Sequence, residues 1–75
     1  MKQLNKKHLG QRIQAARQAA NMTQQELCQD TGLSFSTLAK IERNAIKAPS
    51  IFTVQSIASA LGITLDELMR LDKLS

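Results

Sequence analysis

The segment that decides the fold is TQQELCQDTGLSFSTLAKIER, which runs from Thr23 to Arg43. Thr23 and Glu26 have the spacing of a capping box, in which the hydroxyl and the carboxylate satisfy backbone N–H groups at the start of a helix. Gly32 interrupts the helical pattern, and Ser34 can cap a second helix. The segment therefore predicts two short helices joined by a tight turn at Gly32.

The residue types in this segment suit two helices that cross at close range. The first helix needs a small residue at the contact, the turn needs a residue that accepts the left-handed conformation, and the second helix needs two apolar residues one turn apart. These roles fall to Cys28, Gly32, Leu38 and Ile41. Such a pair is a helix-turn-helix, which places one helix in the major groove of DNA. We interpret Cys28 as a small buried hydrophobe, with a redox or metal role as the open alternative.

The flanking sequence predicts three more helices. One is expected over residues 8–20, where apolar residues recur at steps of three and four. Another begins after a Ser50 cap and ends at Gly62. A third begins at a second capping box, made by Thr64 and Glu67. We therefore predict an all-α fold, a compact domain of five helices.

Composition limits the function classes. The 75 residues make one domain with a net charge of +4, and residues 1–50 hold eight of the ten Lys and Arg side chains but three of the six acidic ones. A basic half suits a polyanionic partner. One His, one Cys and no Gly-rich phosphate loop argue against an enzyme, a metal site or a cofactor. Without a secretory or membrane-spanning apolar run, we expect a cytoplasmic protein that does not enter a membrane.

The chain resembles the Cro/cI-type, or XRE-family, helix-turn-helix domains of phage repressors and bacterial regulators. The resemblance implies the lambda-repressor-like arrangement of five helices. It covers about residues 8–71, with residues 1–7 as a basic arm and residues 72–75 as a tail. The stretches that carry it are Leu9–Ile13, Ala16–Arg17, Met22–Leu27, Gly32–Ser34, Ser36–Leu38, Ile41–Arg43, Pro49–Ser50 and Ile57–Leu68.

The helix after Gly32 is the expected recognition helix, because its polar face lies opposite Leu38 and Ile41. Lysine can donate to guanine, hydroxyls can bond several base edges, and a phenyl ring or a threonine methyl can touch a thymine methyl. The expected base-reading residues are Phe35, Ser36, Thr37 and Lys40.

Phosphate contacts are expected around this helix. The resemblance implies a phosphate contact at Gln24 and an ion pair between Arg17 and Glu42, and it places the loop after the recognition helix along the sugar-phosphate chain. Backbone amides around Asn44 are expected to contribute, and Asn44 stands where the family usually has glycine. The expected phosphate-binding residues are Gln24, Gln25, Arg43, Asn44, Lys47 and Arg17.

The expected function is that of a sequence-specific regulator of transcription, a repressor that binds a pseudo-palindromic operator on double-stranded DNA as a homodimer. One such domain reads few base pairs, so two copies should sit on neighbouring turns, about 34 Å apart. The expected dimer interface consists of Phe52, Leu65, Leu68, Met69 and Leu71. Two alternatives stay open: a longer protein whose missing half supplies the dimer contacts, and an antitoxin that holds a toxin or another protein partner.

Overall fold

Five helices follow one another in the computed structural model, which describes residues 8–69. They are α1 (Leu9–Ala19), α2 (Gln24–Thr31), α3 (Phe35–Glu42), α4 (Ile51–Leu61) and α5 (Leu65–Met69). The described residues contain no strand, so the predicted all-α class is confirmed. The predicted arm over residues 1–7, the tail over residues 72–75 and the interface residue Leu71 lie outside the described residues.

Local hydrogen bonds set the helix boundaries. Thr23 Oγ1 accepts from the Glu26 N–H at 3.0 Å, and Glu26 Oε1 accepts from the Thr23 N–H at 2.8 Å. Thr64 and Glu67 repeat this capping box at the start of α5. Gly32 ends α2 with a φ of 80°, a left-handed conformation that costs glycine little. The predicted boundaries of α2 and the start of α5 are therefore confirmed.

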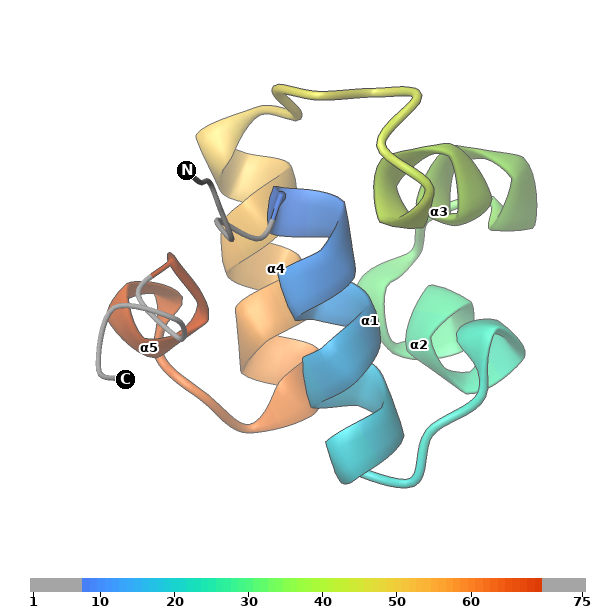
Figure 1. The fold of residues 1–75 in the computed structure, drawn as a ribbon. Helices are drawn as coiled ribbons and strands as arrows, with labels where there is room; N and C mark the ends of the chain where they lie inside the picture. Colours follow the sequence, from blue (N-terminus) through green and yellow to red (C-terminus); the bar gives the residue numbers. More distant parts are fainter. Residues whose placement is uncertain (1–7, 70–75) are drawn as a thin grey trace.

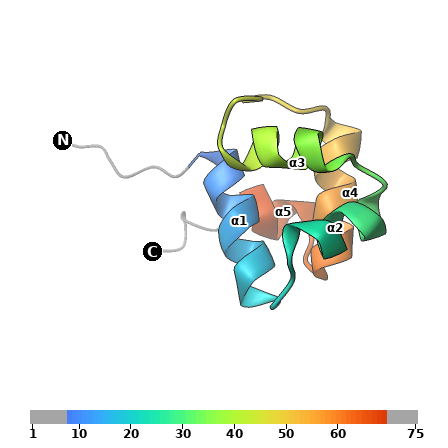
Figure 2. The same ribbon diagram turned by 90° about the vertical axis from the view of Figure 1, so that its right-hand side faces the viewer.

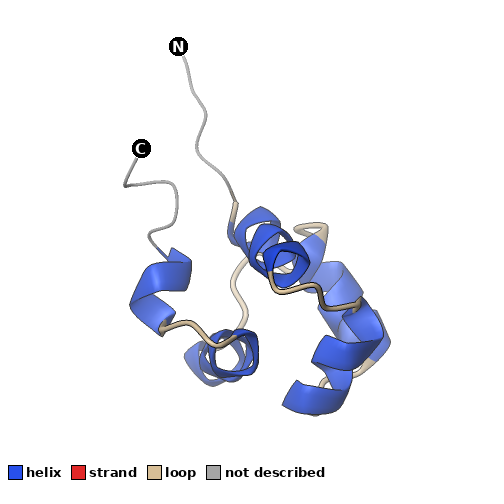
Figure 3. Ribbon diagram, turned by 90° about the horizontal axis from the view of Figure 1, so that it is seen from below, coloured by secondary structure: helices blue, strands red, loops and turns tan. Residues whose placement is uncertain are grey.

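The helices enclose one small core. In Figure 1, α1 and α4 run through the middle of the molecule, with α2 and α3 on one side and α5 on the other. Figure 2 shows α3 lying across the end of the bundle where α1 begins, and Figure 3 shows that only loops join the five helices. The buried apolar side chains come from all five helices: Ile13, Leu27, Leu38, Ile41, Val54, Ile57, Ala58, Leu61 and Leu68.

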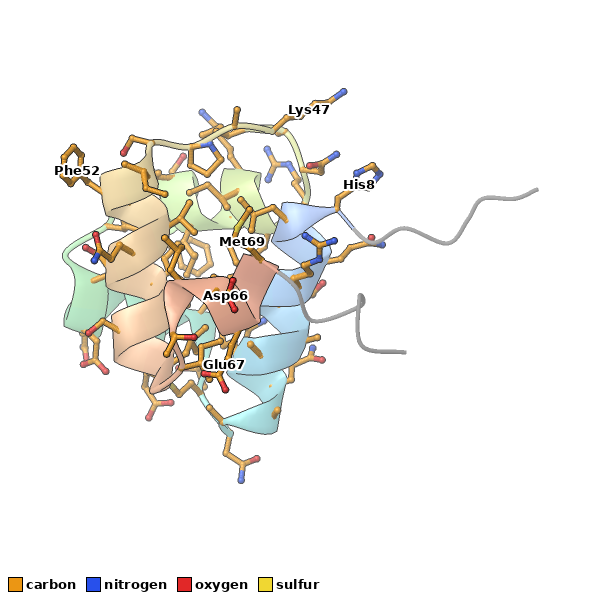
Figure 4. All side chains as sticks on the ribbon, turned by 90° about the vertical axis from the view of Figure 1, so that its left-hand side faces the viewer. His8, Lys47, Phe52, Asp66, Glu67 and Met69 are labelled. Atoms are coloured by element: carbon orange, nitrogen blue, oxygen red, sulfur yellow. The ribbon has the colours of Figure 1, made fainter. Side chains whose placement is uncertain are left out.

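The structure corrects the predicted dimer interface at Leu68. This side chain is fully buried, because the five-residue α5 turns it into the core, and it cannot meet a second subunit. Leu65 is partly buried and packs against the same core. Phe52 and Met69 remain accessible, with 77% and 42% of their surfaces exposed, and both are labelled in Figure 4.

Helices α1 and α3 come close together at Gly10, where α1 crosses the end of α3. A Cβ atom at Gly10 would meet the carbonyl oxygen of Ile41 and would lie 2.7 Å from that of Glu42. Both neighbours are backbone atoms of a packed helix, so neither can move aside easily. Glycine is therefore needed at position 10 for space, a role that sequence reasoning did not identify.

We predict that Gly10→Ala destabilises the domain although alanine favours helices. The added methyl must push α1 away from α3, which costs about 1–3 kcal/mol or more, against a gain of about 1 kcal/mol in helix propensity. Urea denaturation followed by circular dichroism measures the net change. Gln18→Ala, on the exposed side of α1, is the matched control and should change the free energy of unfolding by less than about 0.5 kcal/mol. A Gly10→Ala variant as stable as the parent would show that the two helices can separate freely.

Candidate nucleic-acid interface

Helix α3 presents a continuous outer face. Leu38 and Ile41 point into the core, whereas Phe35, Ser36, Lys40 and Arg43 are exposed. Of the four predicted base-reading residues, Phe35, Ser36 and Lys40 therefore lie on accessible surface.

Thr37 differs from the other predicted base-reading residues. It is half-buried, its backbone N–H donates to Ser34 Oγ at 3.1 Å, and its Oγ1 accepts from the Ser34 hydroxyl at 2.9 Å. These bonds cap the start of α3. The Thr37 side chain therefore has a structural partner, and its role at a base stays a prediction.

The carboxylate of Glu42 joins three helices. Arg17 Nε of α1 donates to Glu42 Oε2 at 2.7 Å, and Arg17 Nη2 donates to Oε1 at 3.2 Å. Gln24 Nε2, at the start of α2, donates to Oε1 at 2.9 Å. Arg17 Nη1 also donates to the Met22 carbonyl at 2.8 Å. These bonds show that the ion pair implied by the resemblance is present. Because Glu42 is only 4% exposed, the pair lies inside the fold.

Gln24 has a role that its sequence position did not reveal. Its side chain was expected at a phosphate, but the structure ties its amide nitrogen to Glu42, 18 residues away. An amide nitrogen carries two hydrogens, so one remains after this bond. The phosphate contacts of Gln24, of the exposed Gln25 and of the buried Arg17 stay predictions.

The expected contact of phosphate with the backbone amides around Asn44 stays a prediction, and three of these amides have partners within the fold. Asn44 has a φ of 68°, and its N–H donates to the Ile41 carbonyl at 3.1 Å. The N–H groups of Ala45 and Ile46 both donate to the Lys40 carbonyl, at 2.8 and 3.1 Å. These bonds close the end of α3 and leave the three amides occupied.

Charged and polar side chains also gather in this region. Arg43 and Lys47 are exposed, and Figure 4 shows Lys47 projecting from the loop at the same end of the molecule as His8. An open hollow of about 420 Å³ lies between the start of α1 and the end of α3. Its lining residues are His8, Gln11, Gln14, Glu42, Arg43 and Asn44. Gln11 and Gln14 were not anticipated, because no motif marks them.

Cys28 is partly buried beside the core. Burial raises the pKa of its thiol, and the negative charge of Glu42 raises it further. The thiol is therefore protonated near neutral pH, which fits its interpretation as a small hydrophobe.

Residues 8–69 contain no cluster of His, Cys, Asp and Glu that could hold a metal. Within the same range, no helix has the length and apolar character needed to cross a bilayer.

Comparisons with known proteins agree with this geometry. A family model described as helix-turn-helix matches residues 13–68. The immunity repressor protein of Bacillus phage phi105 is 46% identical over 55 residues, which cover 73% of this chain and 38% of that protein. The chain therefore spans well under half the length of this relative. The solution structure of the DNA-binding domain of the P22 C2 repressor superposes with a TM-score of 0.81 and 25% identity, covering 92% of this chain and 90% of that one.

We predict that Glu42→Gln is strongly destabilising, because it leaves the Arg17 guanidinium buried without its counter-charge. Breaking a buried pair in this way costs roughly 3–5 kcal/mol, a large part of the stability of a small domain. Urea or thermal unfolding measures the loss. Glu67→Gln, an exposed residue of a capping box, is the matched control and should cost less than about 1 kcal/mol.

A double variant tests whether the cost comes from the stranded charge. Arg17→Met combined with Glu42→Leu removes both charges and should be more stable than Glu42→Gln alone. If the double variant is the less stable of the two, the hydrogen bonds to Gln24 and Met22 contribute more than the charge balance does.

Proposed function

The chain belongs to the helix-turn-helix family, and from this we propose that it is a sequence-specific DNA-binding repressor whose helix α3 enters the major groove. The observation that carries the proposal is the exposed face of α3, whose last residue, Glu42, is bonded to α1 and α2 through its buried carboxylate. The similarity to an immunity repressor supports repression as the direction of control. Occupying a promoter requires no cofactor and no chemistry.

The contacts divide along α3 and its following loop. Ser36 and Lys40 project from the outer face and supply hydrogen bonds to base edges. Arg43 and Lys47 lie at the end of α3 and in the loop, where they hold phosphates. The second side-chain N–H group of Gln24 donates to a phosphate next to those held by Arg43 and Lys47.

A homodimer completes the proposal. A domain that inserts one short helix reads few base pairs, so a regulatory site requires two copies one helical turn apart. The exposed Phe52 and Met69 are the accessible residues of the predicted interface. Nothing in residues 8–69 favours the alternative of a toxin-holding antitoxin, whereas the phage relative is an immunity repressor.

Selection from a random duplex pool, followed by sequencing, tests the proposal. We expect enrichment of a two-fold-symmetric site whose half-sites lie about 10 base pairs apart. The selection should be run at two salt concentrations, with light scattering to give the mass of the complex. Salt-sensitive binding without an enriched motif would contradict the proposal and leave a module whose DNA contact is incidental. Enrichment of single half-sites would contradict the dimer alone.

We further predict that substitutions in α3 and its loop separate specificity from affinity. Lys40→Ala should relax base preference at one position, at a cost of about 1–3 kcal/mol on the selected site. Arg43→Ala and Lys47→Ala should weaken binding to all duplexes and reduce the salt slope by about one each. Gln55→Ala, on the exposed side of α4, is the control that should change neither. Equal losses on selected and random duplexes for all three variants would refute this division.

A further inference from the structure

The outer face of α3 is divided lengthwise into two ridges. Residues four apart on a helix lie on the same side, so Phe35 aligns with Ala39 and Ser36 aligns with Lys40. The first ridge is apolar and the second is polar, and Arg43 follows both at the end of the helix. Ala39, a residue that no motif indicated, is half-buried on the apolar ridge.

The apolar ridge is exposed at a thermodynamic cost. Phe35 keeps 54% of its surface accessible, although burying a phenylalanine side chain is worth roughly 1.5–3 kcal/mol. It occupies the first position of α3, the end of a recognition helix that meets base edges. A phenyl ring offers no hydrogen bond to a polar edge, so it cannot read the donors and acceptors of the groove.

The major groove displays one apolar group, the C5-methyl of thymine. Resting on the proposed function, we propose that the ridge of Phe35 and Ala39 reads thymine methyl groups and thereby sets part of the operator sequence. The alternative apolar reader in this turn is the Thr37 methyl, but Thr37 is half-buried and bound to Ser34 in the helix cap. Phe35 is therefore the main reader.

The spacing of the ridge predicts the spacing of the methyl groups. Four residues of α-helix rise about 6 Å, and this distance spans at most about two base-pair steps of about 3.4 Å each. The contacted thymines should therefore lie within about two base pairs of each other in each half-site. The polar ridge then reads the neighbouring base edges through Ser36 and Lys40.

Uracil substitution tests this inference on the DNA, without altering the protein. Each thymine of the selected site is replaced singly by deoxyuridine, which removes only the methyl group. We expect about a three- to fivefold loss of affinity at one or two positions per half-site, the value of burying one methyl, and no loss elsewhere. Fluorescence anisotropy at constant salt measures the affinities.

Protein variants assign the effect to its residue. Phe35→Ala should bind thymine and uracil equally at one position while keeping its preference at positions read by Lys40, and Phe35→Leu should retain part of the thymine preference. Gln55→Ala, on the exposed side of α4, is the control and should keep the full preference. Thermal unfolding of each variant verifies that it is folded. If a variant does not fold, the uracil series on the unaltered protein still tests the inference.

The outcomes separate this inference from the function on which it rests. If a motif is enriched but uracil replaces thymine everywhere without loss, the methyl-reading ridge is wrong and the repressor proposal stands. A thymine preference that persists in Phe35→Ala also overturns the assignment. Absence of any enriched motif contradicts the proposed function itself.

Discussion

The buried carboxylate of Glu42 is the interaction on which the position of α3, the proposed recognition helix, depends. It stands at the last residue of α3 and accepts hydrogen bonds from Arg17 of α1 and Gln24 of α2. The contact of Gly10 with the carbonyl of the same residue brings α1 against α3 without an intervening side chain. The end of α3 is therefore fixed from two directions, and Arg43, the next residue, begins the loop from a determined position.

This arrangement explains how an eight-residue helix can be held in a fixed position, as its proposed role in reading DNA requires. Helices of that length are marginal in isolation, because nucleation costs more than a few hydrogen bonds return. Two apolar side chains, Leu38 and Ile41, anchor α3 in the core, but apolar contacts alone tolerate small shifts along the groove between helices. Directional bonds to a desolvated carboxylate do not tolerate such shifts. The hydrogen bonds around Glu42 can fix the position of α3 without adding net stability. The cost of removing the two charges from water offsets much of the attraction between them.

Local signals explain what the sequence could predict. The capping boxes, Gly32 and the polar face of α3 depend on residues within four positions of one another, so their structural consequences are visible in the chain. The bond from Gln24 to Glu42 and the space that requires Gly10 depend on residues 18 to 32 positions apart, and no local pattern encodes them. Leu68 was misassigned for a related reason: five residues of helix do not show which apolar side chain faces the core. The ion pair was predicted from the family resemblance alone, because the spacing of Arg17 and Glu42 in the sequence does not indicate that they meet.

The charges of the described surface explain why one copy should be insufficient. With the amides of residues 44–46 occupied within the fold, Arg43 and Lys47 are the exposed cations in and beside the loop after α3. Each neutralised phosphate contributes about −0.9 to the salt slope, so the two proposed contacts would give a slope near −2, much shallower than the slope of about −10 of a tightly bound repressor. Two copies on one duplex double the phosphate contacts and add their base contacts within a single binding event. In the proposed dimer, the small electrostatic contribution of these two side chains would leave isolated half-sites largely unoccupied, and selectivity would follow from the need for both half-sites together.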